Sequence, residues 1–281
     1  MKTSTQLKAR IRNLSEEQNV QAEIILRNYM LERLLERISA SKYHDKFILK
    51  GGMLLSSIVG IDTRSTMDMD ATVRGIQLAE QEIEAVFKRL LAVPVNDGVV
   101  MTLSKIETIH DEADYPGLRI TIQAILDKTR QTIKVDLTTG DLITPHEVEH
   151  RYKLMLEERS ITVWAYNIET VLAEKLESIL SRGTTNTRMR DYYDVHMIMG
   201  QQPGNVDTAI LQKAFRQTAD QRGSYEKIIA NGLEIIKGIA ESDVMFGLWN
   251  RYRKKYPYAS NLVWKDVVIS VGDLFDKIRN R

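Results

Sequence analysis

Two aspartates in an otherwise apolar segment are the first residues of this sequence that could carry out chemistry. Asp68 and Asp70 alternate with Met67, Met69 and Ala71. This period of two predicts a β-strand with both carboxylates on one face, roughly 7 Å apart. Aspartate is a poor strand former, and two carboxylates on one face repel each other unless a cation lies between them. The pattern therefore indicates either a solvated face or a cation site.

A third carboxylate lies in the segment "IKVDLTTGD". Asp136 alternates there with apolar residues, so it occupies the polar face of a half-buried strand. Alone, such a residue is most often surface. If this strand lies beside the strand of Asp68 and Asp70, three carboxylates converge. Oxygen ligands without His or Cys suit Mg²⁺ or Mn²⁺, so we expect Asp68, Asp70 and Asp136 to bind metal.

Two glycines precede the aspartates at the start of a predicted helix, "GGMLLSSIVG". At Gly51 and Gly52 the missing side chains would let a phosphate approach the backbone N–H groups and the helix N-terminus. A glycine pair is usually only a turn, and an Asp-x-Asp is more often a solvated face. The order of glycines, helix, Asp-x-Asp strand and later Asp strand favours phosphoryl or nucleotidyl transfer assisted by metal ions.

The surrounding segments predict the elements that must position these residues. A helix is expected over about 15–41, with Ser15 and Gln18 in capping-box positions, and a second amphipathic helix over 75–93. Further strands are expected over 99–109, 117–126, 131–139, 151–156 and 161–167, with a hairpin at "DKTR". The chain is then helical to its end. We expect an α+β fold: residues 1–165 form a catalytic lobe with a mixed β-sheet, and residues 166–281 form a helical lobe that completes the active-site cleft.

Composition excludes some classes of protein and names none. The 281 residues are 43% hydrophobic, with no cysteine and a formal net charge of +1. No apolar run is long enough to span a membrane and the N-terminus is too polar for a secretion signal, so we expect a cytoplasmic protein. The absence of cysteine excludes disulfides and thiolate metal sites. The net charge gives no general reason to expect nucleic acid.

The combination "KGGMLL…TRSTMDMDATV" resembles the nucleotidyltransferase-fold toxins of the AbiEii/AbiGii type, which belong to type IV toxin–antitoxin and abortive-infection systems. That family also carries a helix of the form "LAEKL" and a later "RDxxD" helix, present here as "VLAEKLESIL" and "RDYYD". The resemblance covers roughly residues 25–200. Met67 departs from it, since many relatives have an acidic residue there, as does the second glycine, which replaces a serine.

The resemblance implies roles for particular residues. Gly51 and Gly52 would face the triphosphate of a nucleotide. Asp68 and Asp70 would bind metal, and Asp136 would be the third carboxylate. Lys175 would contact the phosphates of the nucleotide, and Asp191 or Asp194 would close the site.

The same residues also have simpler interpretations. Lys175 lies at the edge of an apolar helical stripe between Glu174 and Glu177, where its stem could cover apolar surface while these glutamates stay solvated. Asp191 and Asp194 are three apart on one helix face and could form ordinary surface ion pairs. Arg64 could touch phosphate or anchor its loop.

The helical half offers two further features. His196 has no metal-ligand partner at useful spacing, and we expect it to be structural. The segment "WNRYRKKYPYASNLVWK" (residues 249–265) interleaves cations with aromatics, an arrangement that suits an RNA strand through phosphate contacts and base stacking. On sequence alone we favour a solvated helix face with aromatics packed beneath it.

These observations favour a Mg²⁺-dependent nucleotidyltransferase toxin. The resemblance implies that it transfers a nucleoside monophosphate from a nucleoside triphosphate to RNA, at the 3′ end of tRNA, which would block translation. It also implies a cognate antitoxin encoded nearby. Two alternatives remain open: transfer to a protein hydroxyl, and a non-catalytic protein that binds a nucleotide or a partner.

Overall fold

The computed structural model describes residues 3–60, 64–109, 117–201, 204 and 206–279. The chain forms two compact units. The first comprises residues 1–141 and 147–165, and the second comprises residues 142–146 and 166–281. The α+β class expected from the sequence is confirmed, because one unit contains a mixed sheet and the other is helical.

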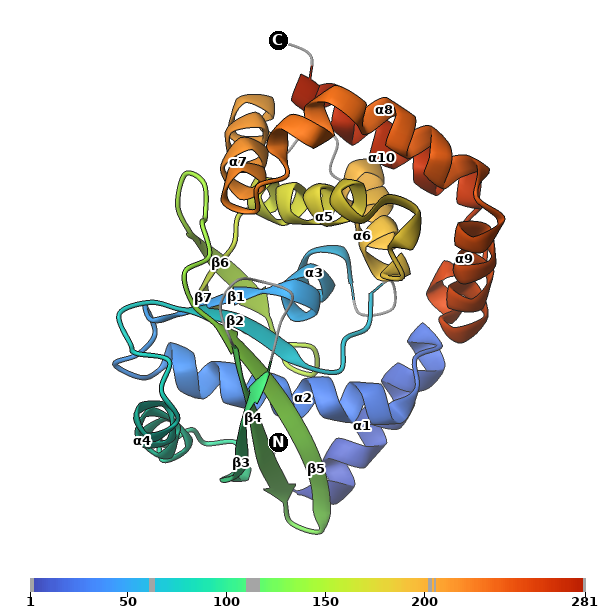
Figure 1. The fold of residues 1–281 in the computed structure, drawn as a ribbon. Coiled ribbons are helices and arrows are strands. Elements are labelled where there is room, and N and C mark those ends of the chain that lie inside the picture. Colours follow the sequence, from blue (N-terminus) through green and yellow to red (C-terminus); the bar gives the residue numbers. More distant parts are fainter. Residues whose placement is uncertain (1–2, 61–63, 110–116, 202–203, 205, 280–281) are drawn as a thin grey trace. The chain divides into compact units, whose positions relative to one another are not determined.

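The described part of the first unit contains a seven-stranded mixed sheet with the order β3-β4-β5-β2-β1-β7-β6 (Figure 1). The strands are β1 (Phe47–Lys50), β2 (Met69–Val73), β3 (Val100–Ile109), β4 (Gly117–Leu126), β5 (Thr129–Thr138), β6 (Val148–Lys153) and β7 (Ser160–Ala165). Strand β2 pairs parallel with β5 and antiparallel with β1. The predicted hairpin between β4 and β5 is confirmed, and its turn contains Asp127 with φ of 52°.

Helices cover this sheet and surround its core. They are α1 (Ser4–Gln18), α2 (Ala22–Ser39), α3 (Gly51–Val59) and α4 (Glu80–Leu91). Helix α2 packs against β5 and β7, α3 against β1 and β2, and α4 against β3. Alternate residues of β4 and β5 are buried because one face of the hairpin lies on this core.

The predicted capping box at Ser15 and Gln18 is wrong. Ser15 lies inside α1, where its hydroxyl donates to the carbonyl of Val20, and α1 ends at Gln18. Asn19 follows in the left-handed conformation with φ of 52°, which ends a helix. The apolar periodicity that predicted one helix therefore belongs to two, α1 and α2. The N-cap of α1 is Thr3.

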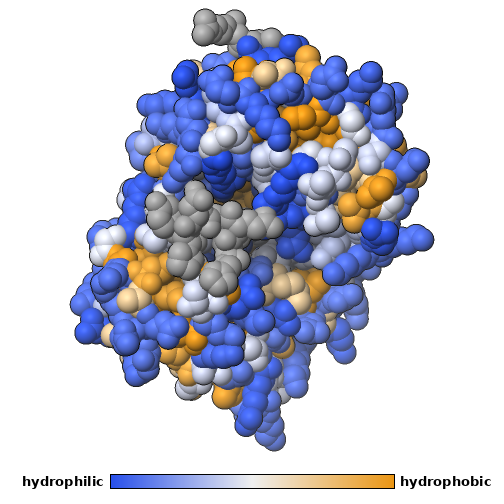
Figure 2. Space-filling model, viewed as in Figure 1, coloured by the Kyte–Doolittle hydropathy of each residue, from blue (hydrophilic) through white to orange (hydrophobic). Residues whose placement is uncertain are grey.

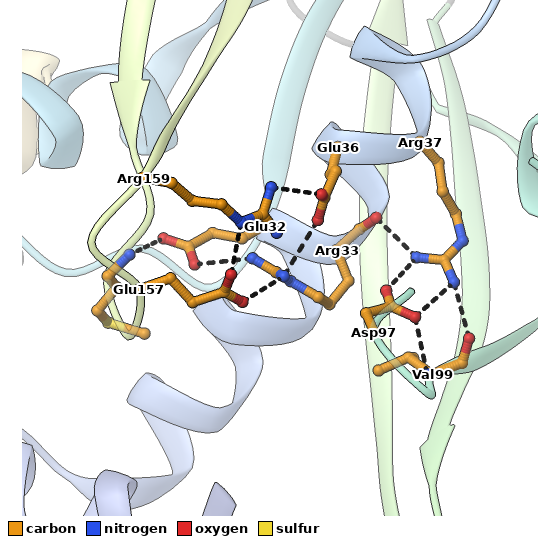
Figure 3. Close-up of polar contacts among 9 residues, drawn as sticks. Glu32, Arg33, Glu36, Arg37, Asp97, Val99, Glu157 and Arg159 are labelled. Carbon is orange, nitrogen blue, oxygen red and sulfur yellow. Dashed lines mark hydrogen bonds and ion pairs between the residues drawn. The ribbon is translucent and has the colours of Figure 1, made fainter. Parts of the chain in front are cut away.

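Helix α2 also carries a network of buried ion pairs (Figure 3). The guanidinium of Arg33 lies 2.7 Å from a carboxylate oxygen of Glu157 and 3.1 Å from one of Glu36. Glu32 accepts a hydrogen bond from the N–H of Met155 at 2.9 Å. Its other oxygen lies 3.8 Å from Arg33. These contacts connect α2 to the segment between β6 and β7.

One turn further along α2, Arg37 connects the helix to the segment before β3. Its guanidinium forms two hydrogen bonds to Asp97, at 2.6 and 3.1 Å, and one to the carbonyl of Val99 at 2.7 Å (Figure 3). Both Arg37 and Asp97 are buried. Each of these buried arginines serves the fold by pairing with buried or partly buried acceptors.

The second unit is helical in the part that the structure describes. Its α-helices are α5 (Ile168–Arg182), α6 (Met189–Gln201), α7 (Thr208–Gln221), α8 (Tyr225–Glu241), α9 (Asp243–Lys255) and α10 (Trp264–Arg279). Asn167 caps α5 by accepting a hydrogen bond from the N–H of Thr170. Helices α5 and α10 each contact α6, α7 and α8 (Figure 1).

The surface of the face drawn in Figure 2 is mainly hydrophilic, with small groups of apolar side chains between the polar ones. Among the described residues, none of the helices is both long enough and apolar enough to cross a membrane.

Candidate active site

A row of charged residues crosses the sheet of the first unit from strand to strand. Lys50 of β1 lies opposite Asp70 of β2, and Asp70 lies opposite Asp136 of β5. Asp136 in turn lies opposite Arg119 of β4, and Arg119 opposite Glu107 of β3. Residues that are direct partners in neighbouring strands share one face of a sheet. Two adjacent carboxylates therefore lie at the centre of this row with a cation on either side.

Asp70 is the carboxylate most perturbed by this arrangement. Removal of its carboxylate from water and the charge of Asp68 are the largest effects, and together they raise the pKa of Asp70 to about 6. The ammonium of Lys50 and a hydrogen bond from the N–H of Gly52 act in the opposite direction, while Asp136 adds to the rise. The ionised form of Asp70 would therefore be stabilised by a further positive charge at this position.

The two glycines are required by close packing at the start of α3. A Cβ atom on Gly51 would lie 2.0 Å from an oxygen of Asp70, and a Cβ on Gly52 would lie 2.5 Å from the hydroxyl oxygen of Thr66. Gly51 also has φ of 66°, a conformation that side chains disfavour. Helix α3 begins at Gly51 as expected, and the Gly52 amide points at Asp70. The glycines hold the helix N-terminus against this carboxylate.

Asp68 lies just outside the strand in which the sequence placed it. Strand β2 begins at Met69, so Asp68 belongs to the bend before it. Its carboxylate accepts a hydrogen bond from the hydroxyl of Thr66 at 3.3 Å. Asp68 is nevertheless close enough to Asp70 to raise the pKa of Asp70. The period of two identified the correct neighbours but extended the strand too far.

Asp136 is held by an arginine that the sequence analysis did not single out. Arg119 donates from Nε to one oxygen of Asp136 at 2.7 Å and from a terminal nitrogen to the other at 2.6 Å. This two-point geometry is the strong form of a charge-assisted hydrogen bond. A signal was available, because Arg119 is a charged residue on the polar face of the alternating segment "GLRITIQAIL". It could not be interpreted without knowing which residue lies opposite.

Lys50 forms a second pair on the same face. Its ammonium donates to Asp141 at 2.8 Å and to the hydroxyl of Thr138 at 2.7 Å. Asp141 also accepts hydrogen bonds from Thr138 and Thr72. Burial raises the pKa of Asp141, but Lys50 and these hydrogen bonds outweigh it, so the net shift is downward. Lys50 and Asp141 were both absent from the predicted site.

Arg64 is buried, and one of its terminal nitrogens donates to the carbonyl of Ser65 at 2.6 Å. The carbonyl of Arg64 accepts from the hydroxyl of Ser56 on α3. These contacts favour the alternative in which Arg64 anchors its loop against α3. A role in nucleotide binding stays a prediction.

A divalent cation fits two of the three predicted ligands. Asp136 and Asp141 each have a cationic partner, whereas Asp68 and Asp70 have no ion-pair partner among the residues that the structure describes. Over the same residues, no group of three or more His, Cys, Asp or Glu side chains is arranged to hold a metal ion. Mg²⁺ commonly uses one or two carboxylates together with water and substrate phosphates. Asp68 and Asp70 match that donor set, while Asp136 is bound to Arg119.

In the second unit, the residues of the two helical motifs form one cluster. The ammonium of Lys175 lies 2.8 Å from a carboxylate oxygen of Asp191 and 2.8 Å from one of Asp194. The side chain of Lys175 is only 14% exposed. Burial acts to lower the pKa of Lys175, but the two carboxylates outweigh it and the pKa rises. As expected, Asp191 and Asp194 share a helix face.

The expectation that Glu177 stays solvated is wrong. Glu177 is buried, and its carboxylate accepts hydrogen bonds from Arg222 at 2.5 Å and from the hydroxyl of Ser224 at 2.8 Å. The apolar stripe of α5 is wider than the sequence indicated because α7 and α8 both pack on this helix. His196 lies 2.8 Å from the hydroxyl of Ser270 through Nδ1, a contact that joins α6 to α10.

The basic and aromatic segment 249–265 divides into two layers. Trp249, Tyr252 and Trp264 are buried, as a helix packed over aromatics requires. Tyr256 and Tyr258 are half-buried and stack on each other, with ring centroids 5.4 Å apart. The cations Arg251, Lys254, Lys255 and Lys265 are exposed, and no carboxylate occurs between Asp243 and Asp266. The layer of aromatics expected beneath the helix is present.

Comparison with known proteins assigns the family. The family model described as "Nucleotidyl transferase AbiEii toxin, Type IV TA system" matches residues 33–278. The chain belongs to this family. It is therefore an enzyme of the nucleotidyltransferase class, from a toxin family of type IV toxin–antitoxin systems, which implies an antitoxin partner and a nucleoside triphosphate substrate. No curated protein matches this AbiEii family chain.

Solved structures support the fold of this AbiEii family member. A putative nucleotidyltransferase from H. pylori matches with a TM-score of 0.51 and 13% identity, over 92% of this chain and 96% of that one. The H. pylori protein JHP933 matches with a TM-score of 0.50 and 12% identity, over 92% of this chain and 93% of that one. At such low identity the likeness concerns the fold, which is that of a nucleotidyltransferase.

Proposed function

We propose that this chain is a Mg²⁺-dependent toxin that transfers a nucleoside monophosphate from a nucleoside triphosphate to RNA, at the 3′ end of tRNA, and so blocks translation. The observation that carries the proposal is the pair Asp68 and Asp70. Asp70 lies beside the N-terminus of α3, Asp68 is close enough to raise the pKa of Asp70, and neither has an ion-pair partner among the described residues. Two unpaired negative charges next to a helix N-terminus suit a divalent cation that also binds phosphate.

In the proposed reaction, a hydroxyl oxygen of the acceptor forms a bond to the α-phosphorus, and the bond to the departing pyrophosphate breaks. A bound Mg²⁺ would supply charge stabilisation for the phosphates. Asp68 and Asp70 would hold it, and the Gly52 amide would keep Asp70 oriented. Asp136 would accept the proton of the acceptor hydroxyl. In the second unit, Lys175 with Asp191 and Asp194 would contact the nucleotide.

Support for an RNA acceptor comes from the resemblance to the family and from the exposed cations of residues 249–265. Arg251, Lys254, Lys255 and Lys265 are positive charges on a stretch without carboxylates, and the stacked rings of Tyr256 and Tyr258 are partly accessible. Phosphate groups bind such cations, and unpaired bases stack on such rings. A cognate antitoxin encoded nearby and a cytoplasmic location are parts of the same proposal.

The test is incubation of the purified protein with each α-labelled nucleoside triphosphate, Mg²⁺, and either total RNA or cell lysate. Label in RNA supports the proposal, and its position at the 3′ end of tRNA would be established by nuclease digestion. Label in protein would identify a protein hydroxyl as the acceptor instead. The absence of label with all four nucleotides would contradict transfer altogether. Asp70→Asn serves as the inactive control.

A further inference from the structure

We propose that Arg119 is a positioning residue for Asp136: it holds Asp136 by a two-point pair and competes with a cation for this carboxylate, so that Asp136 is released when a cation binds. The inference rests on the proposed function and deepens it. Both oxygens of Asp136 accept hydrogen bonds from Arg119, at 2.7 and 2.6 Å. A carboxylate bound in this way has no oxygen free of a charged donor. Each oxygen keeps a further lone pair, but a cation that approaches it is repelled by the guanidinium, so we expect Arg119 to move when Asp136 takes part in the reaction.

The pair is not needed to align β4 with β5. These strands are paired without interruption from Leu118 opposite Leu137 to Leu126 opposite Thr129. Alternate residues of the hairpin, including Ile120 and Val135, are fully buried and already determine the register. An ion pair that adds little to the register is available for another purpose.

Arg119 can also leave Asp136 without opening the core. Its side chain is 35% exposed, whereas that of Asp136 is 16% exposed. On its other side Arg119 faces Glu107, its direct partner in β3. The carboxylate of Glu107 is near enough to raise the pKa of Arg119. Glu107, which also pairs with the exposed Lys105 at 2.6 Å, gives the guanidinium a second carboxylate on the neighbouring strand.

The centre of the row supplies a reason for release. Asp68 and Asp70 are left without an ion-pair partner among the described residues, and Asp136 adds to the charge that acts on Asp70. A divalent cation held by Asp68 and Asp70 would repel the guanidinium and attract Asp136. Arg119 and the cation consequently compete for one carboxylate.

The experiment measures Mn²⁺ binding to the whole chain without nucleotide, by the loss of the electron paramagnetic resonance signal of free Mn²⁺. Arg119→Met removes the guanidinium and keeps much of the apolar stem. It should tighten Mn²⁺ binding about tenfold or more, since charge-assisted hydrogen bonds to Asp136 no longer oppose the cation. Arg119→Lys keeps the charge but cannot form the two-point pair. It should give a smaller gain, and it provides the measurement if Arg119→Met does not fold.

Two further variants separate release of Asp136 from a general loss of positive charge. Arg74→Met is the matched control, because Arg74 pairs with Glu147 at 2.7 Å in the same unit. It should leave Mn²⁺ affinity unchanged. In Arg119→Met with Asp136→Asn, the gain should disappear, because the released carboxylate is absent. If the gain persists in this double variant, or if Arg119→Met and Arg119→Lys both bind Mn²⁺ as the wild type does, the inference is overturned.

Failure of the inference is distinguishable from failure of the proposed function. The inference fails on Mn²⁺ affinity alone, whatever the label-transfer assay gives. The proposed function fails if the wild-type chain transfers no label. If Arg119→Met instead weakens nucleotide binding without changing Mn²⁺ affinity, Arg119 binds substrate and the positioning role is wrong.

Discussion

The first unit contains two clusters of charged side chains that differ in how their charges are balanced. In the network on α2, Arg33 contacts Glu36 and Glu157, and Arg159 contacts the same two glutamates (Figure 3). Two guanidiniums thus meet two carboxylates. Glu32, the remaining carboxyl group, is buried, and burial raises its pKa to about 8. It is therefore mostly protonated at neutral pH, and the network carries no excess charge.

The row across the sheet is not balanced in this way. Lys50 pairs with Asp141 and Arg119 pairs with Asp136, while Asp68 and Asp70 remain unpaired among the described residues. The pKa of Asp70 is raised only to about 6, so Asp70 stays mostly ionised at pH 7. The comparison teaches that buried charge alone does not mark a site. The row differs in its surplus of carboxylates without an ion-pair partner among the described residues, one of which lies against Gly51, Gly52 and the N-terminus of α3.

The largest expected effect is the loss of transfer in Asp70→Asn, which removes one of the two surplus charges. Activity should fall more than about 100-fold, since removing even an outer partner of a metal ligand costs about 10–100-fold. Stability should hold or rise, because Asp70 is repelled by Asp68 and Asp136. The measurements are label transfer and the thermal unfolding midpoint. Asp45→Asn, at an exposed ion pair, is the control. Full activity in Asp70→Asn would mean that the surplus charge has no catalytic role.

Removing a cation from the balanced network should have the opposite outcome. Arg33→Ala leaves the partly buried Glu36 and Glu157 without one of their two shared partners and should cost about 3–5 kcal/mol of unfolding free energy. Activity per folded molecule should not change. Urea unfolding followed by circular dichroism, with transfer assayed on the folded fraction, tests both. A stable Arg33→Ala variant with reduced activity would reverse the comparison.

Replacing Lys175 should affect both activity and stability, because its cluster in the second unit has two carboxylates and one ammonium. Lys175→Ala should lower transfer about tenfold or more if the ammonium meets phosphate, since charge-assisted hydrogen bonds are worth about 1.5–3 kcal/mol. It should also lower stability, because Asp191 and Asp194 lose their partner.

Lys175→Met with Asp191→Asn separates the two contributions. The double variant restores the wild-type net charge of the cluster and should recover part of the stability without recovering transfer. Recovery of both would make the cluster purely structural.

The last prediction concerns pH and no catalytic residue. The pKa of Glu32 is about 8 in the folded chain and near 4.5 when unfolded. Between these values the unfolded chain releases the proton while the folded chain keeps it, so stability falls as pH rises through this window. Glu32→Gln removes this dependence and keeps the acceptor for Met155. Between pH 5 and pH 8, Glu32 should make the unfolding free energy of the wild type fall by at most about 1.4 kcal/mol per pH unit, and this contribution should be absent in the variant. An equal pH dependence in both proteins would contradict a protonated Glu32.

Some features could be predicted from local pattern. The alternation around Asp70 and Asp136 indicated two strands with their carboxylates on polar faces, and the hydrogen-bond register places them opposite each other. The glycine pair marked the start of α3. The division into a catalytic lobe, 1–165, and a helical lobe, 166–281, remains a prediction. In the structure, residues 142–146 belong to the second compact unit. The motif spacing led to the family that the comparison assigned.

By itself, then, the sequence determined the strand periodicity, the helix start at Gly51 and the family, because these depend on backbone geometry and on residues close together in the chain. Only the tertiary structure decided which charges are balanced. Arg119 reaches Asp136 across 17 positions, and Lys50 reaches Asp141 across 91. Glu177 meets Arg222 across 45. Such pairs follow from sheet register and helix packing, which bring together side chains that no local pattern relates, and they separate the paired carboxylates from Asp68 and Asp70.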